Sequence, residues 1–255
     1  MTTVASANVL FTLPPADATA ALDLVLASEP DLVGLQEWYV SRLGLLRRTG
    51  DVRLVPGLGL PGLRVRAANP AGPQYHWVSA VGADTVVGAR ADRFDLLESR
   101  AALISPLARA DRPDRFLSTE PPRFAAVGIF GDRGRDRTIA ILSFHLTATA
   151  EHRGRYREDR PLLARRHQDE VRAIERLVEE YHRAGHVVYA VGDANFDAQR
   201  FTGLTSSWLG REDEPGTFGS GTRKLDDVHG PGPATEVRLI STPSDHRAVL
   251  TTRPD

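Results

Sequence analysis

Cysteine is absent from the 255 residues of the chain, and Lys224 is the one lysine. The absence of cysteine excludes disulfide bonds, zinc-thiolate sites and thiol nucleophiles. Any catalytic metal must therefore be bound by oxygen or imidazole ligands. Asp, Glu, Asn and His favour a hard ion such as Mg²⁺ or Mn²⁺, although a histidine-rich site would also suit zinc.

Long apolar segments are absent as well, and no stretch of the sequence is long and apolar enough to span a bilayer. Residues 1–11 lack a basic segment before their short apolar run, so they predict a first strand and not a secretory signal. Without a signal or cysteine, we expect a cytoplasmic protein. The formal net charge of −1 gives no overall field that would attract nucleic acid, so charge does not identify a substrate.

The composition is that of an ordinary globular protein, with 41% hydrophobic and 25% charged residues. We expect a single domain that spans residues 1–255. Strand-like and helix-like apolar patterns alternate along the chain, which predicts an α/β fold. Strands are expected at 4–11, 31–36, 84–88, 101–105, 124–130, 138–144, 187–191, 225–228, 237–240 and 248–251.

Two amphipathic helices are expected between these strands. The first begins at a cap formed by Asp17 and runs to about Ser28. The second covers residues 162–182 and carries Glu and Arg side chains on the face opposite its apolar stripe. The Gly- and Pro-rich residues 56–73 predict a long irregular connection or hairpin at the surface.

Acids and histidines stand beside several of the predicted strands. Glu37 follows one strand, His145 follows another, and Asp193 with Asn195 follows a third. Ser-Asp-His at 244–246 lies just before the strand at 248–251. One such residue at a strand end is an ordinary solvated side chain. Several of them favour a common catalytic cleft, because α/β sheets bind ligands beyond the carboxyl ends of their strands.

In this order, the motifs resemble the endonuclease/exonuclease/phosphatase superfamily, also called the deoxyribonuclease-I-like proteins. The markers are an early strand Asn, Gln-Glu after an apolar strand, a His after a strand, Gly-Asp-x-Asn, Leu-Asp and Ser-Asp-His, at Asn8, 36–37, His145, 192–195, 225–226 and 244–246. Each marker alone is weak, but together they cover nearly the whole chain. The resemblance implies a four-layer α/β/β/α sandwich of two mixed sheets flanked by helices.

The resemblance also implies a metal-dependent phosphoester hydrolase that uses an activated water. Glu37 and Asp245, with Asn8 nearby, are the expected ligands of Mg²⁺, with Mn²⁺ as an alternative. Asp193 is expected to orient or deprotonate the water, and Asn195 to position Asp193 or a phosphate oxygen. Whether Asp193 or His246 is the general base stays open at this stage.

Two histidine–carboxylate pairs complete the catalytic set that the resemblance implies. His246 is expected to pair with Asp226, and His145 with Glu98, which follows the pattern of the acid that orients this histidine in nuclease members. A carboxylate partner fixes the imidazole tautomer and favours imidazolium, which can donate a hydrogen bond to a phosphate oxygen.

The substrate stays open between three alternatives. An endonuclease or exonuclease acting on nucleic acid is favoured, and Arg153 and Arg155 could contact the phosphate backbone. Nearby acidic residues at 151, 158 and 159 offset much of that charge, so a solvated loop is the other interpretation. The same fold also serves phosphatases and phospholipase-like hydrolases of small or lipid phosphates, or a non-catalytic binding module. We expect a monomer.

Overall fold

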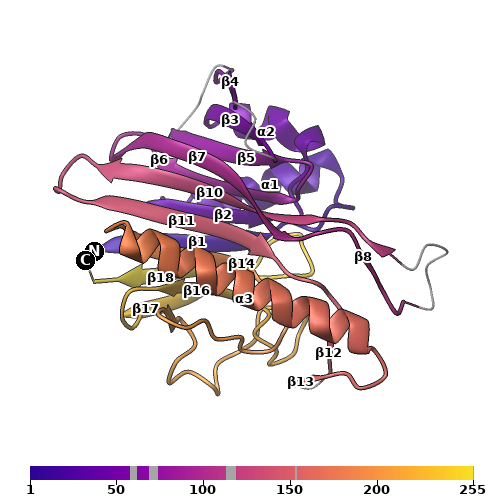
Figure 1. Ribbon diagram of the computed structural model, residues 1–255. Helices are drawn as coiled ribbons and strands as arrows, with labels where there is room; N and C mark the ends of the chain where they lie inside the picture. The colour runs from indigo at the N-terminus through magenta and orange to yellow at the C-terminus, as the bar shows by residue number, and fades with distance from the viewer. Residues whose placement is uncertain (58–61, 69–73, 113–118, 153, 255) are drawn as a thin grey trace.

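Two mixed β-sheets form the centre of the computed structural model, which describes all residues except 58–61, 69–73, 113–118, 153 and 255 (Figure 1). The first sheet has eight strands, in the order β17 (Glu236–Ile240), β18 (Ala248–Arg253), β1 (Thr2–Asn8), β2 (Leu32–Gln36), β6 (Thr85–Arg90), β5 (Tyr75–Val81), β3 (Gly50–Pro56) and β4 (Leu63–Val65). The second has six, in the order β15 (Thr205–Ser206), β16 (Asp226–Gly230), β14 (Val187–Asp193), β11 (Thr138–His145), β10 (Arg123–Asp132) and β7 (Phe94–Ser105).

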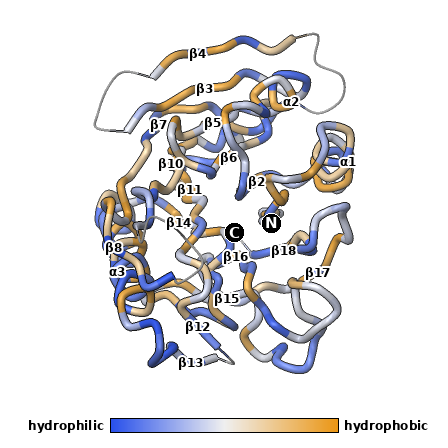
Figure 2. Tube along the Cα trace, turned by 90° about the vertical axis from the view of Figure 1, so that its right-hand side faces the viewer, coloured by the Kyte–Doolittle hydropathy of each residue, from blue (hydrophilic) through white to orange (hydrophobic). Residues whose placement is uncertain are grey.

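Helices cover the outer faces of both sheets. Figure 2 shows α1 (Pro15–Leu26) and α2 (Leu43–Arg47), which follows the short 3-10 turn η1 (Val40–Arg42), on the outer side of the eight-stranded sheet. The long helix α3 (Pro161–Arg183) lies on the outer side of the six-stranded sheet. Two small hairpins, β8 (Ala108–Arg109) with β9 (Thr119–Glu120) and β12 (Glu151–His152) with β13 (Arg155–Tyr156), complete the described strands. The predicted four-layer sandwich is therefore confirmed.

The alternation of side chains along each strand explains the layers. On β11, Ile139 and Ile141 enter the apolar core between the two sheets, whereas Ala140 and Leu142 pack under α3. On β1, Val4 faces the other sheet, and its neighbour Ala5 packs with α1. Apolar residues thus occur at consecutive positions because both faces of the central strands are buried.

The structure departs from the sequence-based expectations at three elements. Helix α1 begins after Pro14, and Asp17 lies within its first turn. The prediction of Asp17 as the cap was therefore wrong. Strands β3 and β5, which pair in parallel, were not predicted. An irregular connection or hairpin was expected at 56–73. Within it, β4 pairs with β3 as a hairpin, and residues 58–61 and 69–73 lie outside the described residues.

No helix in the described part of the chain combines the length and apolarity that crossing a bilayer requires.

Candidate active site

The carboxyl ends of two parallel strand pairs meet at one edge of the sandwich. β1 and β2 run parallel and place Asn8 opposite Gln36, just before Glu37. In the other sheet, β11 and β14 run parallel and place His145 opposite Asp193. The amide Nδ2 of Asn8 donates to Asp193 Oδ2 at 3.0 Å, so the two edges are in direct contact.

Antiparallel neighbours bring further residues to the same edge, because the start of an antiparallel strand lies beside the end of its partner. Asp226 begins β16 and lies opposite Asp193 in register. His246 comes two residues before β18, which is antiparallel to β1. Asp84 directly precedes β6, which is antiparallel to β2, and its carbonyl accepts from the Trp38 amide at 3.0 Å.

The carboxylate of Asp193 is the centre of this arrangement and is only 1% exposed. Its Oδ1 accepts the Asn195 backbone N–H at 2.7 Å, and its Oδ2 accepts the Asn8 and Asn195 amides at 3.0 and 3.3 Å. The Nε2 atoms of His145 and His246 lie 3.7 and 4.0 Å from the same Oδ2. Both separations exceed a hydrogen bond, so the two imidazoles approach this oxygen from a short distance without bonding to it.

Each histidine is oriented by its own aspartate. His246 Nδ1 donates to Asp226 Oδ2 at 2.7 Å, which is the predicted pair. His145 Nδ1 donates to Asp84 Oδ2 at 2.6 Å. In both rings the bond at Nδ1 leaves Nε2 directed at Asp193.

The predicted pairing of His145 with Glu98 was wrong. Glu98 is exposed in the middle of β7, where it lies opposite Ile129. Its charge adds to the effect of burial in raising the pKa of Tyr181, which lies near the end of α3. Asp84 takes its place because β6 starts next to the end of β2. Asp84 is the first residue of the strand predicted at 84–88, but the sequence does not show which strand lies beside it, so this position alone did not mark it as the partner of His145.

These contacts shift the pKa values of all three central groups. Burial lowers the pKa of His246, but Asp226 and then Asp193 outweigh it and raise the value to about 10. Burial also lowers the pKa of His145, but the charge and hydrogen bond of Asp84 outweigh it, so the pKa is raised. The pKa of Asp193 is raised, first by burial and then by Asp226, while the two histidines act against the rise. At neutral pH His246 therefore favours the imidazolium form, and the pKa of His145 is shifted in the same direction.

Asn8 and Glu37 offer oxygen ligands that would fit a cation. Asn8 is 2% exposed, and its Oδ1 is buried without a hydrogen-bond partner. Its Nδ2 lies 3.3 Å from Glu37 Oε1. Glu37 itself has a positive φ of 56°, a strained conformation of the kind that functional residues adopt. An unpaired buried amide oxygen beside a carboxylate is what a hard cation would satisfy.

A second group of acids and histidine could also hold a cation. Ligand atoms of Asp193, Asp226 and His246 all lie within 4.8 Å of one another. However, imidazolium has no free lone pair for a metal, and the raised pKa of His246 keeps it in that form at neutral pH. Asp245, the other predicted metal ligand, is exposed, and its backbone carbonyl accepts from the Gly219 amide at 3.0 Å.

Arg123 at the start of β10 was missed by the sequence reasoning. Its Nη1 donates to the His145 carbonyl at 2.9 Å, and its charge lowers the pKa of Asp84. No motif marks it, because it reaches the site from the neighbouring strand. Of the two predicted phosphate contacts, Arg155 is exposed on β13, and Arg153 lies outside the described residues.

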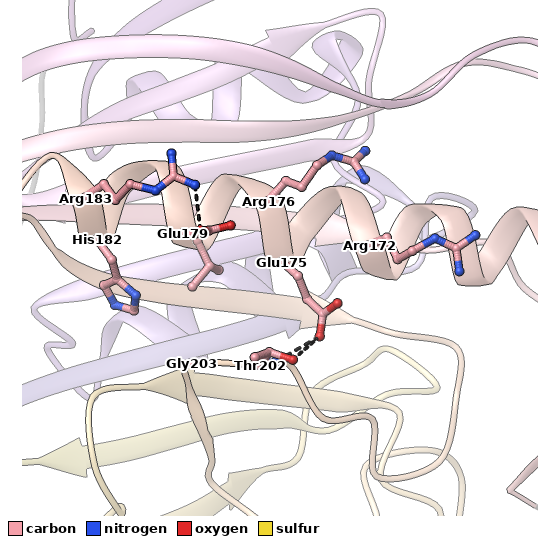
Figure 3. Close-up of a pocket in the computed structure, with 9 residues that line it drawn as sticks. Arg172, Glu175, Arg176, Glu179, His182, Arg183, Thr202 and Gly203 are labelled. Atoms are coloured by element: carbon pink, nitrogen blue, oxygen red, sulfur yellow. Dashed lines mark hydrogen bonds and ion pairs between the residues drawn. The ribbon is translucent and has the colours of Figure 1, made fainter.

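A surface groove of about 600 Å³ lies elsewhere, against the outer side of α3 (Figure 3). Figure 3 shows Glu175 bonded to Thr202 on one side and Arg183 paired with Glu179 along the helix. None of the acids or histidines at the sheet edge lines it. The groove is therefore separate from the candidate active site.

Comparison with known proteins gives matches in structure alone. The sequence matches no protein-family model and no curated protein. TDP2 from D. rerio, complexed with a single-strand DNA product, aligns with a TM-score of 0.63 and 16% identity over 98% of this chain and 97% of that chain. A mannosyl-6-phosphatase from Bacteroides thetaiotaomicron has a TM-score of 0.63 and 16% identity over 98% of each chain.

An endonuclease/exonuclease/phosphatase family protein from Bacteroides thetaiotaomicron aligns with a TM-score of 0.62 and 17% identity, over 98% of this chain and 93% of that chain. The overlap is nearly complete in both directions, so the likeness concerns the whole sandwich. At this level of identity the comparisons establish the fold alone, which this chain shares with TDP2, with the mannosyl-6-phosphatase and with the endonuclease/exonuclease/phosphatase family protein.

Proposed function

We propose that this chain, with its endonuclease/exonuclease/phosphatase fold, is a metal-dependent phosphodiesterase that hydrolyses nucleic acid with an activated water. The observation that carries the proposal is the convergence of two aspartate-paired histidines on one buried carboxylate oxygen, Asp193 Oδ2. Two fixed cationic donors beside a carboxylate suit an in-line attack on a phosphoester. They supply positive charge for the phosphate oxygens and a base for the water.

In this proposal Asn8 Oδ1, Glu37 and Asp245 hold Mg²⁺ or Mn²⁺. When bound there, the ion supplies Lewis-acid polarisation of a phosphate oxygen. The Oδ1 atom of Asn8 supports this assignment, because it is buried and accepts no hydrogen bond. The Asp193–Asp226–His246 group is assigned to proton transfer, because the 2.7 Å bond to Asp226 fixes the His246 ring with its Nε2 directed at Asp193.

Asp193 takes the proton of the attacking water, since its raised pKa makes it a stronger base than an ordinary aspartate. The water oxygen bonds to phosphorus, and the bond from phosphorus to the leaving oxygen breaks. His145 and His246 donate hydrogen bonds from Nε2 to the phosphoryl and leaving oxygens, and one of the two imidazolium groups gives its proton to the leaving oxygen. Asn195, bonded to Asp193 and to the Leu146 carbonyl at 3.1 Å, holds the base in place.

The choice of nucleic acid follows the TDP2 structure, whose complex contains a single-strand DNA product. The mannosyl-6-phosphatase shares the same fold, so a small phosphate monoester is the alternative substrate. The two alternatives differ in the loops around the site and not in its central acids. A substrate panel therefore separates them.

The test is hydrolysis of single-stranded DNA, RNA, plasmid DNA and mannose 6-phosphate in Mg²⁺, Mn²⁺ or EDTA. Cleavage of nucleic acid should require the metal, and Asp193→Asn should lower kcat by about 10²- to 10⁴-fold. Asp213→Asn is the matched control, because Asp213 is an exposed acid outside the site. Activity that survives Asp193→Asn would overturn the site, and turnover of mannose 6-phosphate alone would move the protein to the monoester class.

Metal binding is measured separately by calorimetry with Mg²⁺ or Mn²⁺. Glu37→Gln should weaken binding by about tenfold or more, because one of the few charged ligands is lost. Glu236→Gln on β17 changes an exposed acid and should leave the affinity unchanged. Equal affinities for both variants would contradict the proposed ligands.

A further inference from the structure

Exposed aromatic rings gather at the candidate active site. Among the residues that the structure describes, the exposed aromatic side chains are Phe11, Tyr39 and Phe218, with exposed fractions of 58%, 44% and 36%. Phe11 lies three residues beyond Asn8, and Tyr39 lies two beyond Glu37. The ring of Phe218 stands 4.9 Å from the imidazole of His246. Exposing an apolar ring to water is unfavourable, so a group of such rings around charged residues indicates a binding site.

Phe11 and Tyr39 form a pair that is built into the site. Their ring centroids are 6.1 Å apart and the ring planes meet at 78°, an edge-to-face contact. The backbone N–H of Phe11 donates to Glu37 Oε2 at 2.8 Å. The pair is therefore fixed to the same carboxylate that we assign to the metal.

Arg42 fixes the backbone of this pair through hydrogen bonds. Its Nη2 donates to the carbonyls of Leu10 and Phe11, both at 2.9 Å. Its guanidinium also lies 5.7 Å from the ring of Trp38, next to Tyr39 in sequence. One half-buried cation thus ties residues 10–11 to the segment that carries Tyr39, which fixes the placement of the two rings.

We propose that Phe11 and Tyr39 form a nucleobase-stacking subsite beside the scissile phosphate, and that the substrate is single-stranded nucleic acid. This inference rests on the proposed function and specifies its substrate. The chemistry of the subsite favours a flat aromatic group, because stacking on aromatic side chains accepts every base through its π-face. Two rings offer far less area than the roughly 800 Å² per partner of a standard protein interface.

The base must be unpaired to reach these rings. In a duplex both faces of each base are covered by its neighbours, and unstacking a base costs free energy. A single strand presents base faces at no such cost. The subsite would therefore orient one nucleotide while its phosphate lies at Glu37, Asn8 and Asp193, whose contacts have been described.

The experiment measures binding by fluorescence anisotropy in an Asp193→Asn background with Mg²⁺, where turnover is suppressed. Two oligonucleotides of equal length are compared: a single-stranded DNA, and the same backbone with every base replaced by an abasic tetrahydrofuran. The base-containing strand should bind about tenfold or more tightly than the base-free strand. Phe11→Ala and Tyr39→Ala should each remove most of this difference and leave binding of the base-free strand unchanged.

Two variants make the result specific. Tyr39→Phe keeps the ring and should keep the preference for bases, which a general folding defect would not allow. Leu24→Ala removes an exposed apolar side chain of α1 and should have no effect. Equal binding of the two strands, or a preference that survives both alanine variants, would overturn the subsite.

Hydrolysis by the wild-type protein then separates this inference from the proposed function. Cleavage of both strands at equal rates would keep the phosphodiesterase and exclude the subsite. A base preference in binding without cleavage of either strand would keep the subsite and overturn the phosphodiesterase.

Discussion

A single carboxylate oxygen organises the candidate site at the scale of residues. Asp193 Oδ2 is approached by two amides and by two imidazole nitrogens, and each imidazole is held from behind by an aspartate. Chain order identified Asp193, His145, His246 and Asp226, because motif residues there follow or precede strands. Chain order could not identify Asp84. The role of Asp84 depends on β6 being the neighbour of β2, and the local sequence does not determine the order of strands in a sheet.

The corrected partner of His145 gives a prediction at this scale. Asp84→Asn removes the charge that favours imidazolium and weakens the bond that fixes the ring, so kcat should fall by about 10- to 100-fold. Steady-state hydrolysis of a single-stranded oligonucleotide measures the effect.

Glu98→Gln is the control for this substitution, because it changes the acid that the sequence favoured and that the structure finds exposed on β7. It should leave kcat unchanged. A large loss with Glu98→Gln and none with Asp84→Asn would restore the original pairing.

At the scale of elements, the amphipathic pattern predicted α3 nearly to its ends, because a helix covering a sheet repeats its apolar positions. The same pattern assigned its Arg and Glu side chains to solvent, and this was wrong for Arg166 and Glu170, which are buried. Glu170 accepts from the Thr147 N–H at 2.7 Å and from its hydroxyl at 2.8 Å. These bonds hold the segment that follows His145.

His167 on the same helix supports the segment that follows Asp193. Its Nε2 donates to the Ala194 carbonyl at 2.6 Å, while the Tyr156 hydroxyl lies 3.1 Å from Nδ1. Burial lowers the pKa of His167, which keeps the ring neutral with one donor and one acceptor. The apolar periodicity predicts which face of the helix packs on the sheet. It does not reveal the polar partners of the helix that lie far away in the sequence.

The contact of β2 with the other sheet gives a prediction for strand packing. A Cβ added at Gly34 would lie 2.1 Å from Cγ2 of Val191 and 3.3 Å from Oγ of Ser143. Gly34→Ala should therefore force β2 and β14 apart and lower the free energy of unfolding by about 1–3 kcal/mol. Urea denaturation at neutral pH measures the change.

Gly44→Ala is the matched substitution, since a Cβ at Gly44 in α2 meets nothing within 4 Å. It should raise the free energy of unfolding by up to about 1 kcal/mol, because alanine favours a helix. A Gly34→Ala protein as stable as the wild type would show that the two sheets pack less closely at this point than the structure has them.

At the scale of the whole molecule, the site joins the two halves of the sandwich through charged groups. Asn8 and Glu37 belong to the eight-stranded sheet, and His145, Asp193 and Asp226 belong to the other. The fold class followed from the alternation of strands and helices together with the family resemblance. The parallel pairing of β3 with β5 was not predicted. The two strands are joined by a Gly- and Pro-rich connection, and the local pattern of the sequence does not show which strands become neighbours.

The ionisation of the two paired histidines predicts how stability depends on pH. The pKa of His246 rises to about 10 and that of His145 is also raised, relative to about 6.5 in an unfolded chain. A raised pKa in the folded state means that the stabilisation is complete below pH 6.5. It is lost as the pH rises from 6.5 through the folded-state values. The free energy of unfolding, measured in EDTA with urea, should therefore fall between pH 6.5 and 9.5.

Replacing one of these histidines should make that fall smaller. His246→Gln cannot carry the charge that Asp226 and Asp193 stabilise, so its free energy of unfolding should decline by about 3 kcal/mol less than that of the wild type over the same interval. His182→Gln, at an exposed position of α3, should follow the wild-type decline. An equal decline in all three proteins would mean that the Asp226–His246 pair does not stabilise the charged ring, and the imidazolium donor of the proposed reaction would fall with it.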